Sequence, residues 1–338
     1  MRGIELEPVS RWLVDNVAGA EAPFDFELIA GGRSNLTYKV TGADGGVFVL
    51  RRPPIGEVLA TAHDMAREHR IIAALGPTAV PVAPALGLCK DADVNGAPFY
   101  VMGYVSGLVL DSPEKAAALA PAIRRTASER LVDVLATLHE VDVDEVGLGD
   151  LARRDGYLER QLKRWSAQWA ASKTRELPAI EEVERRLRID PPPQQGVAIV
   201  HGDYRFGNML IGDAGELRAV LDWELCTLGD PLADVGWMLV YWSDPGEARQ
   251  ANDPTTAGGF LGRDEVLERY GRSTNRDLSR LSYYAAFGYW RSAIIGEGVY
   301  ARYLNGQMGD DEVDLSRFEE GTPRLAALAL EATNTMDQ

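Results

Sequence analysis

The sequence predicts an α+β protein of two lobes, a small β-rich N-terminal lobe at residues 1–104 and a larger, mainly helical lobe at 105–338. Alternating apolar and polar residues, the period of a β-strand, dominate the first hundred residues, whereas apolar residues at helical spacing dominate the rest. The segment "GYVSG", residues 103–107, separates the two patterns. Because small-molecule ligands commonly bind between domains, we expect a binding cleft near this junction.

The N-terminal lobe is predicted to hold a short helix, five strands and one longer helix. Apolar residues recur at helical spacing between Leu6 and Val17, which predicts the first helix. The stretch 85–104 predicts a hairpin that turns at Asn95-Gly96, a dipeptide preferred in two-residue turns. The other elements are strands at 24–30, 35–40 and 47–52 and a helix at 57–75.

The C-terminal lobe is predicted to be helical apart from a few short strands. Helical periodicity is seen at 119–139, 154–171, 178–189, 229–242, 276–296 and 322–333. Strands are expected at 197–200, 208–212 and 217–222. With 338 residues and 46% hydrophobic content, the chain is long enough to form a sizeable core in each lobe.

The amino-acid composition and net charge exclude some classes of binding partner and of structural feature. The net charge of −16 makes the chain a poor candidate for binding nucleic acids or anionic membranes. Two cysteines far apart in sequence predict neither a disulfide framework nor a cysteine metal site. No apolar run has membrane-spanning length, and the N-terminus has no apolar signal segment. We expect a cytoplasmic protein; its oligomeric state is not predicted.

The segment "IVHGDYRFGNMLI", residues 199–211, places polar groups between two strand-like runs. Asp203 lies on the connecting loop, Asn208 begins the next strand, and Asp222 ends the strand after it. If these two strands form a hairpin, the two carboxylates and the carboxamide converge at one edge. Oxygen ligands of this kind suit Mg²⁺, and phosphoryl transfer also needs a carboxylate that orients the attacking hydroxyl.

The pattern His-Gly-Asp, four residues, then Asn, together with "DWE" and "GDPLADVGWML", resembles the aminoglycoside phosphotransferase family, a small-molecule branch of the protein-kinase-like fold. The chain is most similar to the subgroup related to kinase-like domains of some acyl-CoA dehydrogenases. The resemblance implies a bilobal protein-kinase-like fold, Asp203 as catalytic base, and Asn208 and Asp222 as metal ligands. It implies a mainly structural role for Asp230 and Asp234.

The same resemblance assigns a nucleotide site to the first lobe. The segment "GGRSNLTYKV" joins two strands, and glycine-rich turns can present backbone N–H groups to phosphates. No Gly-Lys-Ser or Gly-Lys-Thr occurs, so it is not a Walker loop, and a strand rather than a helix follows it. The resemblance implies phosphate contacts from Gly31, Gly32, Ser34 and Asn35.

Strand 47–52 is expected to supply a cation for the nucleotide. Arg51 stands where the family usually has lysine, and its planar guanidinium can also bind phosphate. Strand alternation directs Arg52 to the opposite face, where we expect it to be solvated. The acidic partner of Arg51 is expected to be Glu68, with Glu57 as an alternative. Adenine would bind the backbone of the hinge, made of Gly103, Tyr104 and Val105.

The predicted function is a Mg²⁺-dependent phosphotransferase that moves the γ-phosphate of ATP or GTP to a hydroxyl of a small molecule. One alternative is a non-catalytic nucleotide-binding protein of the same fold. Another, a metal-dependent phosphoesterase, usually needs several histidine ligands. Only His201 of the four histidines lies near these acids, and we expect the other three, His63, His69 and His139, at the surface or at helix caps.

The acceptor remains open between aminoglycosides, amino alcohols, sugars and hydroxyacyl compounds. An acidic loop at 309–314 could attract a cationic acceptor. A set of aromatic residues after 280 instead suggests a flatter or more apolar one, because pockets mirror the polarity of their ligands. This set is Tyr283, Tyr284, Trp290 and Tyr300. On that basis an aminoglycoside is possible but not favoured.

Overall fold

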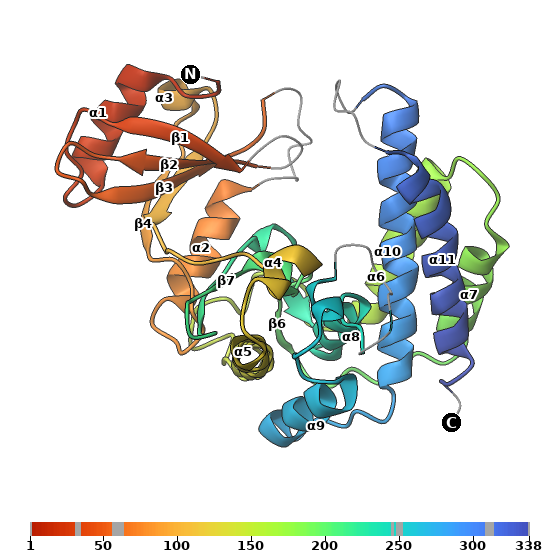
Figure 1. Ribbon diagram of the computed structural model, residues 1–338. Coiled ribbons are helices and arrows are strands. Elements are labelled where there is room, and N and C mark those ends of the chain that lie inside the picture. Colours follow the sequence, from red (N-terminus) through yellow and green to blue (C-terminus); the bar gives the residue numbers. More distant parts are fainter. Residues whose placement is uncertain are drawn as a thin grey trace.

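The computed structural model describes residues 2–30, 35–55, 64–244, 247, 253–307 and 314–336. It confirms the predicted α+β class: a five-stranded antiparallel sheet comes first and a mainly helical part follows (Figure 1). The predicted phosphate-loop residues Gly31, Gly32 and Ser34, the alternative acid Glu57, and His63 lie outside the described residues. None of the described helices combines the length and apolarity that crossing a bilayer requires.

The N-terminal sheet has the strand order β1-β2-β3-β5-β4. Its strands are β1 (Asp25–Ala30), β2 (Leu36–Thr41), β3 (Val47–Arg52), β4 (Ala85–Cys89) and β5 (Phe99–Gly103). Helix α1 (Leu6–Asn16) buries Val9 and Leu13 against Tyr38 and Leu50 of the sheet. These apolar side chains form a core of their own.

The connection between β4 and β5 differs from the predicted two-residue turn. It contains a helical turn, α3 (Ala92–Asn95), which begins where the Asp91 side chain accepts a hydrogen bond from the backbone N–H of Asp93. Gly96 has a left-handed backbone (φ 69°) and ends this helix, as glycine often does. Asn95 is buried and accepts a hydrogen bond from the Glu5 backbone, so it joins α1 to the sheet.

Helix α2 (Met65–Leu75) connects the sheet to the rest of the molecule. Asp64 caps it by accepting from the Arg67 backbone N–H, and the part of the predicted helix before Asp64 lies outside the described residues. Its buried side chains Met65, Ile72 and Leu75 belong to the large core of the helical lobe. The Arg67 guanidinium donates to the carbonyls of Leu151 and Cys226 in that lobe.

The helical lobe contains two short β-ribbons. β6 (Ala198–Val200) pairs with β9 (Thr227–Gly229), and β7 (Met209–Ile211) pairs with β8 (Leu217–Val220). Three 3₁₀ turns are η1 (Phe206–Asn208), η2 (Trp223–Leu225) and η3 (Pro254–Ala257). The helices are α4 (Pro113–Ala117), α5 (Pro121–His139), α6 (Tyr157–Ser172), α7 (Pro178–Ile189), α8 (Leu232–Val240), α9 (Arg263–Thr274), α10 (Leu281–Leu304) and α11 (Ser316–Thr333).

All six predicted helices of this lobe are present, but the five-residue helix α4, helix α9 and strand β9 were not predicted. Half of the residues of helix α9 are charged, and it buries only Val266 and Tyr270, so its apolar periodicity is weak. β9 has three residues, too few to show a strand pattern. Helices α6, α7, α10 and α11 lie together on the side of the molecule away from the sheet (Figure 1).

Candidate active site

The loop after β6 is shaped by a buried carboxylate. Asp234, on α8, accepts hydrogen bonds from the backbone N–H groups of His201 (2.6 Å) and Gly202 (2.8 Å). Gly202 has φ 85°, and a Cβ atom there would lie 2.9 Å from the Leu225 carbonyl oxygen. Only glycine fits this position, so the loop has little freedom at the residue before Asp203.

Two histidines support the same loop. His201 Nδ1 accepts from the Asp203 backbone N–H (3.2 Å), so Nε2 carries the ring proton and donates to the Leu221 carbonyl (2.9 Å). His139 is also buried; its Nε2 lies 3.3 Å from Asp234 and its Nδ1 lies 2.8 Å from the Tyr270 hydroxyl. His139 is therefore not at the surface; it lies at the end of a helix, the other position expected for it, as the last residue of α5. Burial lowers the pKa of His139.

Asp203 is held from three directions. The Trp237 indole donates to Oδ1 (2.7 Å), the Asn208 amide donates to Oδ2 (2.7 Å), and Arg205 Nε lies 3.2 Å from Oδ1. The carboxylate keeps 19% of its side-chain surface exposed. Its orientation is thus fixed by charge-assisted hydrogen bonds while part of it can still be reached.

The predicted hairpin brings Asn208 and Asp222 together. Met209 pairs with Val220, and the Leu221 backbone N–H donates to the Asn208 carbonyl (2.8 Å), one residue before Asp222. Asp222 has a left-handed backbone (φ 62°), unusual for a residue with a side chain. The structure therefore gathers Asp203, Asn208 and Asp222 on one hairpin and its leading loop.

Arg51 joins the two lobes. Its Nε lies 2.9 Å from Glu68 Oε2 on α2, and its Nη2 lies 2.5 Å from Asp222 Oδ1. Glu68 is buried and also accepts from the Asn35 amide (2.8 Å) and the Tyr100 hydroxyl (3.1 Å). Burial alone would lower the pKa of Arg51, but the carboxylates of Glu68 and Asp222 outweigh it and raise this pKa above its usual value.

Arg52 faces away from this cluster, as strand alternation requires, but it is not solvated as expected. It is buried, and its guanidinium donates to the backbone carbonyls of Gly3 and Asn95. Arg52 therefore ties the N-terminus and the β4–β5 connection to the sheet. This difference arises because the outer face of β3 is covered by backbone that the strand pattern does not reveal.

The predicted hinge follows β5. The Gly103 N–H donates to the Pro84 carbonyl (2.8 Å), and a Cβ atom at Gly103 would meet the Pro84 ring at 3.1 Å. Tyr104 is exposed, with the Lys39 ammonium 5.6 Å from its ring centre, and Val105 is half-buried.

Several residues around the site were not predicted. Glu224 lies two residues after Asp222, and the Asn35 amide lies 3.5 Å from its carboxylate. Burial and the neighbouring Asp222 carboxylate raise the pKa of Glu224 to about 7. Trp237 stands three residues after Asp234, a spacing that places two residues on the same side of a helix. That spacing could have indicated that Trp237 lies near the site, whereas nothing in the sequence indicated Arg205.

The aromatic residues that suggested an apolar acceptor are buried in the protein. Three of them use their polar atoms inside the protein: Tyr283 donates to the Leu187 carbonyl, Tyr284 to Asp230, and Trp290 to the Ile180 carbonyl. Tyr300 is also buried and donates to Glu319. These side chains are therefore part of the protein interior and give no indication about the acceptor. Of the acidic loop at 309–314, only Asp314 lies within the described residues.

Asn208 and Asp222 can supply two oxygen ligands to a divalent cation, whose other ligands would be water and substrate oxygens. Among the described residues, both hydrogen bonds of the Asn208 side chain use its amide nitrogen, so its carbonyl oxygen is left for another partner. In the described part of the chain, no three His, Cys, Asp or Glu side chains are grouped as a metal site. One amide oxygen and one carboxylate suit Mg²⁺, which usually completes its shell with water and phosphate oxygens.

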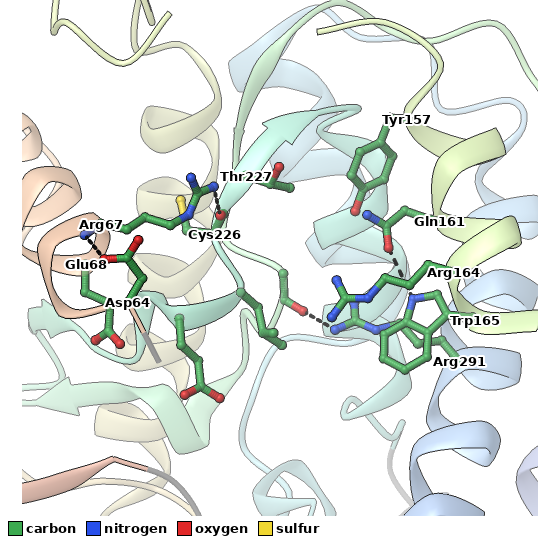
Figure 2. Close-up of a pocket in the computed structure, with 13 residues that line it drawn as sticks. Asp64, Arg67, Glu68, Tyr157, Gln161, Arg164, Trp165, Cys226, Thr227 and Arg291 are labelled. Carbon is green, nitrogen blue, oxygen red and sulfur yellow. Dashed lines mark hydrogen bonds between the residues drawn. The ribbon is translucent and has the colours of Figure 1, made fainter. Parts of the chain in front are cut away.

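A pocket of about 530 Å³ opens next to the Asp203 loop (Figure 2). Its lining comes from five parts of the fold: the start of α2, helix α6, helix α10, the loop at 202 and the segment 224–227. Arg164, Trp165 and Arg291 lie together on one side, and Asp64 and Glu68 lie on the other (Figure 2). The pocket thus touches both the Arg51–Glu68 pair and the residue preceding Asp203.

Comparison with known proteins identifies relatives of this chain. Acyl-CoA dehydrogenase family member 10 of Mus musculus is 36% identical over 290 residues, which cover 82% of this chain but only 26% of the mouse protein. A crystal structure from Ralstonia eutropha JMP134, provisionally named an aminoglycoside phosphotransferase, has 32% identity and a TM-score of 0.83. It covers 97% of this chain and 98% of that one.

A more distant structure shares the fold alone. The thermostable mutant of aminoglycoside phosphotransferase APH(4)-Ia, in ternary complex with AMP-PNP and hygromycin B, has 15% identity and a TM-score of 0.61. The match covers 96% of this chain and 98% of that one. The model of the phosphotransferase enzyme family matches residues 25–269, more than half of the sequence. Fold, motifs and relatives agree, and this chain belongs to the phosphotransferase enzyme family.

Proposed function

We propose that this protein transfers the γ-phosphate of ATP or GTP to a hydroxyl group of a small molecule. The observation that carries the proposal is the convergence of Asp203, Asn208 and Asp222 with the Arg51–Glu68 pair at the junction of the two lobes. This set combines a fixed carboxylate, oxygen ligands for a cation, and a guanidinium for phosphates, which phosphoryl transfer requires.

The nucleotide would bind to the lobe formed by residues 1–104. Arg51 would contact its phosphates, with Asn35 and the neighbouring Gly31, Gly32 and Ser34 supplying further donors. The hinge of Gly103, Tyr104 and Val105 would contact the base. Support comes from the complex of APH(4)-Ia with AMP-PNP, which shares this fold. Residues 105–338 would supply the catalytic groups and the acceptor site.

Asp203 would act as the catalytic base. Its carboxylate would accept a hydrogen bond from the acceptor hydroxyl and orient the oxygen toward the γ-phosphorus. The new bond joins this oxygen to phosphorus, the bond from phosphorus to the bridging oxygen breaks, and ADP or GDP leaves. The hydroxyl proton passes to Asp203. Trp237 and Asn208 keep the carboxylate in one orientation, so little reorganisation is needed.

Asn208 and Asp222 would hold Mg²⁺ through their side-chain oxygens. When bound, the ion neutralises charge on the nucleotide phosphates. Asp222 also contacts Arg51, so its carboxylate already lies beside the residue proposed to bind these phosphates.

The alternatives receive less support. A non-catalytic nucleotide-binding protein would not need Asp203 held in place, yet three side chains hold it here. A phosphoesterase with two metal ions would need histidine ligands. His201 is the histidine next to these acids, and both of its ring nitrogens take part in hydrogen bonds to backbone groups.

The function is tested by ADP release from Mg·ATP in the presence of candidate acceptors. The panel contains aminoglycosides, amino alcohols, sugars, hydroxy acids and hydroxyacyl thioesters, each compared with the rate without acceptor. We expect saturable turnover of one class and its loss when EDTA removes Mg²⁺. Tight binding of Mg·ATP without turnover of any class would favour the non-catalytic alternative instead.

A variant of Trp237 tests how Asp203 is positioned. Trp237→Phe keeps an aromatic ring but removes the hydrogen bond to Asp203. Because a hydrogen bond to a charged group contributes about 1.5–3 kcal/mol, we expect kcat to fall about tenfold or more. The KM for ATP should stay unchanged, since Trp237 contacts the base and not the proposed nucleotide site.

Trp169→Phe is the matched control. Trp169 is equally buried, but its indole nitrogen has no hydrogen-bond partner among the described residues. This variant should retain wild-type kcat and a similar melting temperature. If both variants lose turnover in parallel with stability, Trp237 has only a packing role.

A further inference from the structure

The pocket beside the Asp203 loop is lined by three guanidinium groups, those of Arg67, Arg164 and Arg291. Within the described ranges, no carboxylate forms an ion pair with any of the three. The chain has a net charge of −16, and many of its other arginines do form such pairs. Asp64, Glu68 and Glu224 line the same cavity, but none of them forms an ion pair with these arginines. Guanidinium groups without an ion-pair partner, in so acidic a protein, indicate a site for an anion.

The three arginines differ in how many hydrogen bonds their guanidinium groups already donate within the protein. Arg67 donates two hydrogen bonds to backbone carbonyls, so its nitrogens are largely occupied. Arg291 is 6% exposed and donates to the Gly202 carbonyl (2.7 Å), while its Nε is buried and has no hydrogen-bond partner among the described residues. Arg164 is exposed and makes no hydrogen bond to any described residue. Arg164 and Arg291 are thus the residues whose guanidinium groups can bind a ligand.

Trp165 keeps these two guanidinium groups together. The Arg164 carbon Cζ lies 5.3 Å from the centre of the Trp165 ring, and that of Arg291 lies 5.1 Å from it. The Trp237 ring contacts Arg291 as well, at 4.0 Å. Stacked guanidinium groups stay planar and present their N–H groups at the edge, which suits bidentate binding of a carboxylate or phosphate.

The position of this group relates it to the proposed reaction. Arg291 contacts the carbonyl of Gly202, the residue before the proposed base Asp203. Figure 2 shows Arg164, Arg291 and Trp165 on the α6 and α10 side of the pocket, opposite Glu68. The acids that also line the pocket, Asp64, Glu68 and Glu224, come from the start of α2 and the loop after Asp222. The cationic side is therefore separate from the side proposed for nucleotide and metal.

We infer that the acceptor of this enzyme carries an anionic group, a carboxylate or a phosphate, in addition to the hydroxyl that is phosphorylated. Arg164 and Arg291 bind this group, and Trp165 packs beneath it. A volume of about 530 Å³ lies within the usual range for small-molecule pockets. The inference rests on the proposed function, and it excludes polycationic acceptors because they would meet unpaired guanidinium groups.

The test measures binding by calorimetry with saturating Mg²⁺ and AMP-PNP, so that anions cannot occupy the nucleotide site. Two pairs of probes differ mainly in the anionic group: hydroxybutyrate with its amide, and a glucose phosphate with glucose. Kanamycin serves as the cationic probe. We expect the anionic member of one pair to bind at least about tenfold more tightly than its partner, as one charge-assisted hydrogen bond allows. The pair that shows this difference identifies the anionic group of the acceptor as a carboxylate or as a phosphate.

Arg164→Gln should abolish this preference, whereas Lys163→Gln, a change at the exposed neighbouring position on the same helix, should preserve it. Equal binding within both pairs, tighter binding of kanamycin, or an unchanged preference in Arg164→Gln would overturn the inference. Titrating the pairs again without nucleotide separates the two proposals. A preference for anions with no binding of AMP-PNP, or with no phosphate transfer to any probe, would contradict the proposed function alone.

Discussion

Replacement of Asp203 by alanine should lower turnover at least about a hundredfold, because a positioned general base typically contributes a factor of 10² to 10⁴. Asp203→Asn should be similarly inactive, since an amide keeps the shape of the side chain but cannot take up the hydroxyl proton. The affinity for Mg·ATP should barely change in either variant. The reason is that Asp203 contacts Trp237, Asn208 and Arg205, and it makes no contact with Arg51.

The measurement pairs ADP release in the presence of an acceptor with calorimetry of Mg·ATP. Asp213→Asn is the control, because Asp213 is a fully exposed acid beyond the end of β7. It should behave as wild type in both assays. Near-normal phosphate transfer by Asp203→Asn would show that another group takes the proton, and the assignment of Asp203 would then be wrong.

Arg51→Ala should have the second large effect, on both stability and nucleotide binding. The change leaves the buried carboxylate of Glu68 without its ion-pair partner. Removing one member of a buried pair typically costs about 3–5 kcal/mol of unfolding free energy. We therefore expect a clear loss of stability in chemical denaturation and a large loss of affinity for Mg·ATP, since the proposed phosphate contact is lost as well.

Arg51→Lys should recover much of the affinity, because a single ammonium can still reach Glu68 and a phosphate, though not with the planar geometry of arginine. Arg52→Ala provides the comparison at the neighbouring residue on the opposite face. It should destabilise the sheet by removing donors to the carbonyls of Gly3 and Asn95, while ATP affinity stays unchanged below its melting temperature. If instead Arg52→Ala abolishes ATP binding and Arg51→Ala does not, the proposed nucleotide site is on the wrong face.

Much of the fold was predictable from local pattern. The strands of the sheet and all six proposed helices of the second lobe were predicted because their side chains alternate or repeat at helical spacing. The hairpin that joins Asn208 to Asp222 followed from two short apolar runs with a turn between them. Helix α9 was not predicted because it contacts the core through only two buried residues.

The site was predictable where it depends on neighbours in sequence and less so where it depends on packing. Asp203 and Asn208 are five residues apart, and the Arg51–Glu68 pair followed from the family pattern. The contact of Arg51 with Asp222 joins residues 171 positions apart, and the Trp237 contact depends on how α8 packs. Likewise, the burial of Tyr283 and Trp290 is a property of packing that composition alone misjudged, and the exposure of Arg164 to the pocket is one that the sequence did not indicate.

The packing of α2 leads us to expect cooperative units that do not follow chain order. Helix α1 shares one core with one face of the sheet, whereas Met65, Ile72 and Leu75 of α2 belong to the larger core, to which Tyr100 of β5 also contributes. Local opening tends to follow such units, so α1 and the sheet can unfold as one foldon while α2 stays in place. Glu68 would remain with α2 and Arg51 would leave with β3. Every such opening event therefore takes the site apart, and the ion pair forms again only when the sheet docks.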